Sequence, residues 1–170
     1  MEQLKALSRE QLEKLIVDFS KRWLAHDGLW FQAVERGRDL EEAIRYDADA
    51  WEKFTVIEAK RIMDFLGLTP GGGLEALEQA LKFRLYALIN VQQIERVDAK
   101  TLILKMTECR VQSARSRKGL ADFPCKSVGL VEYAYFAKTI DARIKTRCIA
   151  CPPDEHPREF FCAWEFTLED

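Results

Sequence analysis

Residues 160–168 read FFCAWEFTL, and this stretch decides the fold class because a large apolar side chain falls on almost every second position. Such alternation is typical of a half-buried β-strand. A similar alternation, weakest in the first segment, predicts three more strands, over residues 89–97, 101–111 and 142–149. A helix is expected over residues 125–138. The C-terminal half, residues 86–170, therefore predicts a small antiparallel sheet backed by one or more helices.

The first half of the chain follows a helical period instead. Apolar and aromatic side chains recur at steps of three and four residues from Leu12 to Trp30, which predicts a long helix ending near residues 36–37. Further helices are predicted, a short one over residues 40–47 and longer ones over residues 49–66 and 74–88. We therefore expect an α+β fold in which a helical subdomain, residues 1–85, packs on the sheet of residues 86–170 in one compact unit.

Composition limits the function. The chain has 170 residues, 48% of them hydrophobic, and a formal net charge of −2. It is long enough for a buried core, and its charge gives no footprint for bulk nucleic-acid binding. No stretch approaches the roughly 20 apolar residues that span a bilayer. The N-terminal MEQLKALSREQLEKL lacks the apolar block of a signal peptide, so we expect a cytoplasmic protein without nucleic-acid or membrane partners.

Four of the five cysteines lie near the C-terminus, with the spacing C-x22-C-x2-C-x10-C: Cys125, Cys148, Cys151 and Cys162. The central C-x2-C lets two thiolates turn towards one metal ion. Cys125 is predicted at a helix N-terminus, where the helix dipole favours the thiolate. The alternative is that cysteines such as Cys162, which shares the parity of Trp164, are simply buried small side chains. Spacing alone leaves both interpretations open.

Three stretches, CKSVGLVEY (125–133), CIAC (148–151) and FCAWEF (161–166), resemble the 4-vinyl reductase domain superfamily, which includes phenol-sensing domains of certain transcription activators. In those sensors a structural zinc is held by Cys, Glu, Cys and Cys. The resemblance implies Cys125, Cys148, Cys151 and Cys162 as ligands, with Cys148 in place of the glutamate and a longer gap before Cys162. An all-thiolate set suits zinc, and an iron–sulfur cluster uses the same ligands.

Over the whole chain, blocks such as LAHDGLWFQAVE (24–35), WEKFTVIEAKRIM (51–63) and DFPCKSVG (122–129) resemble a family of small prokaryotic cytosolic proteins without an established activity. The general layout is similar, more weakly, to the 2-amino-thiazoline-4-carboxylate hydrolases. That likeness implies a hydrolase or lyase acting on a small carboxylate-bearing compound of sulfur or nitrogen. Related domains commonly pair, so a homodimer is a further expectation.

Polar side chains interrupt two aromatic helix faces. His26 lies on the face of Trp23 and Trp30, where it is either a core histidine or an acid, base or ligand at a pocket. Glu58 and Arg61 interrupt a second aromatic face. They form either an ion pair with each other or a site in which Arg61 holds a ligand carboxylate and Glu58 orients it.

The strand predicted from Thr101 supplies the last candidates. Its inward parity continues into polar residues, which predicts a pocket floor that includes Arg110 and Gln112. Cys109, the fifth cysteine, is either a packed side chain or a nucleophile that would need His26 as its base. The candidate catalytic residues are therefore His26 and Cys109, and the candidate ligand-binding residues are Trp23, Trp30, Glu58, Arg61, Arg110 and Gln112.

Together these observations favour a small-molecule-binding protein with a structural zinc site formed by four cysteines. The first alternative is the hydrolase or lyase, in which Arg61 and Arg110 would hold a carboxylate and His26 would move protons. The second is an iron–sulfur redox or sensor protein.

Overall fold

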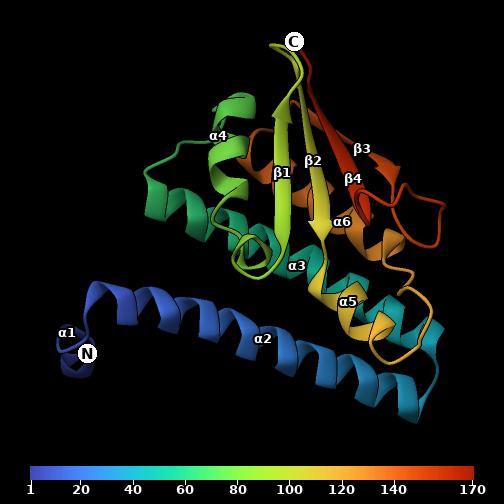
Figure 1. Ribbon diagram of the computed structural model, residues 1–170. Coiled ribbons are helices and arrows are strands. Elements are labelled where there is room, and N and C mark those ends of the chain that lie inside the picture. The colour runs from blue at the N-terminus through green and yellow to red at the C-terminus, as the bar shows by residue number, and fades with distance from the viewer.

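The computed structural model describes residues 1–170 and consists of helices and one four-stranded antiparallel sheet with strand order β1-β2-β4-β3 (Figure 1). The α+β fold class predicted from the sequence is thereby confirmed. The helices are α1 (Glu2–Lys5), α2 (Arg9–Gly37), α3 (Leu40–Leu66), α4 (Gly73–Leu81), the 3-10 helix η1 (Leu85–Leu88), α5 (Arg110–Ser116) and α6 (Lys126–Ile140). The strands are β1 (Val91–Arg96), β2 (Thr101–Glu108), β3 (Ile144–Ala150) and β4 (Cys162–Leu168).

The two long helices begin and end at side chains suited to those positions. Ser8 and Gln11 form a reciprocal capping box at the start of α2. The Asp39 side chain accepts a hydrogen bond from the Glu42 backbone N–H at the start of α3. Gly67 ends α3 with φ of 68°, a left-handed conformation that glycine adopts without strain. None of the helices is both long enough and apolar enough to cross a membrane.

Three details of the predicted elements are wrong. The single helix expected over residues 74–88 is divided into α4, which ends at Leu81, and the 3-10 helix η1. The helices expected over residues 40–47 and 49–66 are one continuous helix, α3, because no glycine or proline interrupts the chain between them. The strand expected to reach residue 111 ends at Glu108, and the next residues form α5. The side chain of Asn90 accepts the Arg110 backbone N–H at 2.8 Å, and the Cys109 carbonyl accepts the Ser113 N–H at 2.9 Å. These contacts start a helix that local sequence does not signal.

The core lies between α6 and the two central strands. Leu104 of β2 pairs with Trp164 of β4, and both side chains are almost fully buried. The Trp164 indole lies so close to Gly129 of α6 that a Cβ atom at position 129 would be 2.5 Å from the ring. A glycine is therefore required at this point of the helix, because any side chain would push α6 off the sheet.

Arg84, just before η1, is buried and joins α3 to α6. Its guanidinium lies 2.8 Å from Glu58 Oε2 and 2.7 Å from Glu132 Oε1. It also lies 4.6 Å from the ring centre of Phe136. Burial acts to lower the pKa of Arg84, but the charges of Glu58 and Glu132 outweigh burial and raise it, so the guanidinium stays charged. This cluster holds α3, α6 and η1 together.

Helix α2 lies across the end of the sheet at which β2 finishes (Figure 1). Its seam with the rest of the protein is aromatic: Trp23 packs edge-on against Trp51 at 5.9 Å and stacks with Phe54 at 5.2 Å between ring centres. Ser20 is the one α2 residue that is fully buried. Helix α2 therefore lies over the rest of the protein and contributes little to its buried core.

We predict opposite effects for two glycine substitutions. Gly129→Ala should destabilise the protein by about 1–3 kcal/mol, because the added methyl overlaps the Trp164 ring. Gly28→Ala should stabilise it by about 0.5–1 kcal/mol, because position 28 lies inside a helix and a Cβ there meets no other atom within 4 Å. Urea denaturation measures both. Equal effects would contradict the close approach of α6 to β4.

Candidate functional site

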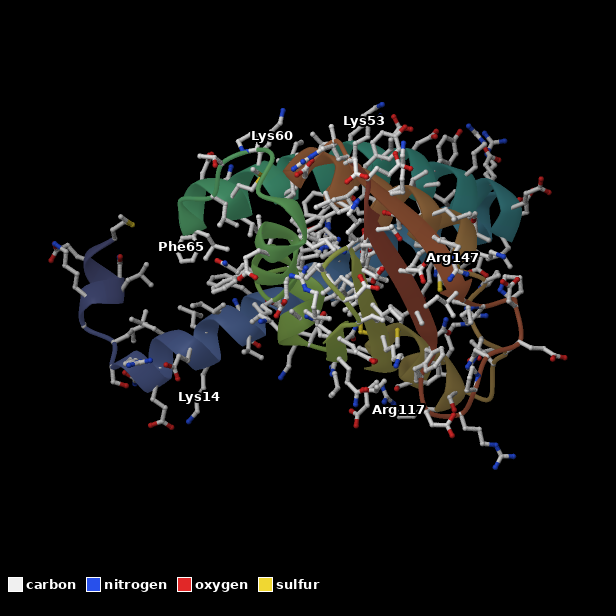
Figure 2. The ribbon with its side chains drawn as sticks, turned by 90° about the horizontal axis from the view of Figure 1, so that it is seen from above. Lys14, Lys53, Lys60, Phe65, Arg117 and Arg147 are labelled. Carbon is white, nitrogen blue, oxygen red and sulfur yellow. The ribbon has the colours of Figure 1, made fainter.

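A cavity of about 720 Å³ lies between α2, α3, α5, α6 and the ends of β2 and β4. This volume is in the range of small-molecule sites. More than half of its lining residues are hydrophobic, including Phe31, Trp51, Phe123 and Trp164. Arg117, which also lines it, lies at the outer edge of the molecule (Figure 2), so the cavity reaches the surface beside α5.

Charge is distributed unevenly along this cavity. Basic side chains from α5, the loop after it and α2 lie around it: Lys21, Arg110, Arg115, Arg117 and Lys118. Four carboxyls line it: Asp27 and Glu35 of α2, Asp47 of α3 and Glu132 of α6. Glu132 contacts Arg84, but neither Asp27 nor Asp47 forms an ion pair with any residue of the chain.

The two aspartates are near each other because α2 and α3 run antiparallel. Trp23 of α2 contacts Trp51 of α3, so the residue one turn further along α2 faces the residue one turn earlier on α3. Those residues are Asp27 and Asp47. Burial raises the pKa of Asp47 to about 7, helped by the charges of Asp27 and Glu132. Burial also raises the pKa of Asp27 and of Glu132.

The predicted metal ligands are partly brought together. The Sγ atoms of Cys125 and Cys151 are 3.6 Å apart, and Cys162 is close enough to raise the pKa of Cys151, after Cys125 itself. Cys125, Cys151 and Cys162 line the cavity. Cys148 does not; it pairs with Trp164 across the β3–β4 ladder, next to a bulge that precedes Ala150. No group of three or more His, Cys, Asp or Glu side chains is arranged to hold a metal ion.

Gln112 fixes one side of this cysteine cluster. Its amide accepts the Phe123 N–H at 2.8 Å and donates to the Phe123 carbonyl at 2.9 Å. The same Nε2 lies 3.6 Å from Cys125 Sγ. Gln112 lines the cavity but is almost fully buried, so its hydrogen bonds position the loop that carries Cys125 at the N-terminus of α6.

The proposed catalytic pair does not share the cavity. Cys109 lines it, and burial raises the pKa of its thiol to about 12. A thiol with such a pKa carries little thiolate at neutral pH. His26 is exposed on α2 and does not line the cavity. The structure therefore provides no base beside the Cys109 sulfur.

The predicted ligand-binding residues fall into two groups. Arg110 and Gln112 line the cavity. The other four do not: Trp23 lies in the α2–α3 seam, Trp30 is 64% exposed, Arg61 is exposed, and Glu58 is buried against Arg84. Glu58 thus has a buried ion pair, as one interpretation held, but with a residue 26 positions away in place of Arg61.

Sequence reasoning missed the four cavity carboxyls. A signal for two of them was present, because Asp27 lies four residues after Trp23 and Asp47 lies four residues before Trp51. Such spacing places each aspartate on the same helix face as an aromatic residue. An acidic residue on the packing face of each of two neighbouring helices is unusual, since unpaired buried carboxylates are costly.

Comparison with known protein families gives one finding. A family model described as "Family of unknown function (DUF6125)" matches residues 5–168 of the chain. The match shows no link to vinyl reductase domains or to thiazoline hydrolases. No curated protein matches the chain.

The Asp47 carboxyl predicts a pH-dependent stability. Between its unfolded pKa of about 4 and its folded pKa of about 7, the folded protein keeps a proton that the unfolded chain has released. Stability therefore falls as pH rises through this window. Asp47→Asn should raise the free energy of unfolding by about 1–3 kcal/mol at pH 8 and change it little at pH 4.

Chemical denaturation at the two pH values measures this difference. Asp49→Asn, at an exposed position of the same helix, is the matched control and should have no such pH dependence. A variant Asp47→Asn that is less stable than the native protein at pH 8 would contradict the electrostatic account.

Proposed function

The chain belongs to the DUF6125 family, described as a family of unknown function, and from this premise we propose that the protein binds a small, largely apolar molecule in the cavity. The observation that carries the proposal is the cavity itself. It is concave and about 720 Å³ in volume, and 18 of its 32 lining residues are hydrophobic, with charged side chains of both signs among the others. These are the usual features of a small-molecule site.

Other features support this function. The likeness of the C-terminal half to the vinyl reductase superfamily points the same way, since that superfamily includes domains that sense small aromatic compounds. The hydrolase or lyase alternative has less support, because Arg61 and His26 lie outside the cavity and the Cys109 thiol stays protonated. The cytoplasmic location expected from the sequence stays part of the proposal.

A substitution in α2 that fills the cavity tests the proposed binding function. Gly28 lines the cavity, and a Cβ there meets nothing within 4 Å, so Gly28→Leu would place an apolar side chain in the open space. We expect the neutral dye N-phenyl-1-naphthylamine to bind the native protein and to bind this variant at least about tenfold more weakly. Fluorescence titration measures both affinities.

Gly37→Leu is the matched control. Gly37 ends the same helix, has equally open surroundings and does not line the cavity. Its substitution should leave dye binding unchanged. Equal dye affinity in both variants, or no dye binding to the native protein, would rule out this cavity as the site.

We also propose that a structural zinc ion is held by Cys125, Cys148, Cys151 and Cys162. Two thiolates on tetrahedral zinc lie about 3.8 Å apart, given Zn–S bonds of about 2.3 Å. The 3.6 Å between the Cys125 and Cys151 sulfurs suits that geometry. Zinc would tie the N-terminus of α6 to β3 and β4, which is a structural role. Cys148 and Cys162 would have to approach the other two sulfurs.

Metal content tests the zinc proposal. Protein purified under reducing conditions without added metal should contain about one zinc per chain by mass spectrometry, and no visible absorbance. Cys125→Ser and Cys151→Ser should lose the metal, whereas Cys109→Ser should keep it. Less than about half an equivalent of any metal would overturn the proposal. Iron with sulfide, and a brown colour, would replace zinc by the iron–sulfur alternative.

A further inference from the structure

We propose that the ligand of the cavity is an organic cation, a protonated amine carried on an apolar body, and that Asp27 and Asp47 are its charge partners. This inference rests on the proposed function, since it needs the cavity to be a binding site. It adds the chemical class of the ligand and the residues that select it. Three features of the cavity wall carry it: two carboxyls without an ion-pair partner, an aromatic surface and an unpartnered hydrogen-bond donor.

The first feature is the missing counter-charge. Arg84 is the cation of two buried carboxyls, Glu58 and Glu132. Basic side chains also line the cavity from α2, α5 and the loop after α5, but none of them forms an ion pair with Asp27 or Asp47. Asp27 of α2 and Asp47 of α3 are close enough for the charge of Asp27 to raise the pKa of Asp47, and neither carboxyl has a cation as partner. Like charges in a partly buried place repel each other, and burial adds to the cost. A ligand cation between the two carboxylates would remove both penalties.

The second feature is the aromatic wall beside them. Trp51 and Tyr86 stack at 5.6 Å between ring centres, and both line the cavity together with Tyr133. Ring faces attract cations, most strongly where water is excluded. The same rings already accept one cation in this protein, because the Arg84 guanidinium lies 6.0 Å from the Trp51 ring and 5.4 Å from the Tyr133 ring.

The third feature is an unsatisfied donor. The Nε1–H of Trp164 is buried, has no hydrogen-bond partner and belongs to a residue that lines the cavity. Buried indole N–H groups usually find an acceptor. A hydroxyl or ether oxygen on the ligand body would supply one. The predicted ligand therefore has an amine at one end and an oxygen acceptor on an otherwise apolar frame.

A metal ion is a poorer occupant. Asp27 and Asp47 belong to no group of three or more His, Cys, Asp or Glu side chains that could hold a metal ion, and the cavity is far larger than an ion with its water shell. A proton shared between Asp27 and Asp47 is the remaining competitor. It predicts no preference among ligands of different charge, so the two explanations are separable by experiment.

Binding of the amine is coupled to release of a proton. The groups that face Asp47 are Asp27 from α2, Glu132 from α6, Tyr86 from η1 and Trp51 on its own helix. At neutral pH a fraction of Asp47 is protonated. When the ammonium group arrives, that proton leaves the Asp47 carboxyl for solvent and the carboxylate pairs with the ligand. Affinity for the amine should therefore fall as pH is lowered from 8 to 5.5.

The test compares three probes of one shape and different charge: tyramine (cationic), tyrosol (neutral) and 3-(4-hydroxyphenyl)propionate (anionic). Isothermal titration calorimetry at pH 8 and pH 5.5 measures their affinities for the full-length protein. We expect tyramine to bind at least about tenfold more tightly than the other two at pH 8. The gap should narrow at pH 5.5, because Asp47 is then protonated.

Variants assign the effect to the two aspartates. Asp27→Asn and Asp47→Asn should each weaken tyramine at least about tenfold and leave tyrosol unchanged, because only the charge partner is removed. Asp49→Asn, exposed on the same helix, should change neither. The expected gain in stability of Asp47→Asn means that a loss of tyramine binding cannot be ascribed to unfolding.

Each other outcome overturns the inference. If tyrosol binds as tightly as tyramine, the cavity still binds small molecules but does not select a cation. If tyramine binding survives Asp47→Asn, the aspartates only share a proton. If none of the probes and no neutral dye binds, the proposed function fails together with this inference.

Discussion

The buried guanidinium of Arg84 fixes the geometry on which the rest of the structure depends. It is held between Glu58 of α3 and Glu132 of α6, and it lies over the ring of Phe136. Because an arginine with two carboxylates has little freedom to shift, α3 and α6 keep one separation and η1 stays beside them. The aromatic residues of η1 and α6 then face the space under α2. A buried ion cluster of this kind adds little net stability, but breaking one contact leaves an unpaired charge, so it enforces a single arrangement.

Local sequence patterns were sufficient for much of this fold. The alternating strand of residues 162–168, the long α2 and the helix that starts at Cys125 are where the patterns placed them. The patterns failed at α5, because its start is set by Asn90, some 20 residues earlier in the chain, which accepts the Arg110 N–H. The patterns also predicted two helices where α3 is a single one, because residue types that cap a helix also occur within it. Where such helices begin depends on contacts between residues distant in the chain, and a local hydrophobic period does not report these contacts.

The cavity was harder to predict than the fold for the same reason. Residues that interrupt an aromatic face were predicted to bind a ligand. In the structure Glu58 forms an ion pair with Arg84, and Arg61 is exposed. The residues that do line the cavity, such as Asp47, follow the helix period of their aromatic neighbours and interrupt nothing. Their importance appears only when two helices are placed face to face. The cysteines were the better guide, because Cys125, Cys151 and Cys162 do converge on one wall.

Helix α2 has a single fully buried residue, and its aromatic seam is centred on Trp23. An element with so few buried contacts is expected to open more readily than the sheet and α6. Backbone amides of α2 should thus exchange with deuterium through a local opening that leaves the Arg84 cluster intact. The same opening uncovers the cavity along one whole side. The cavity would then be open on two sides, beside α5 and along α2, so its accessibility would depend on how often one helix detaches.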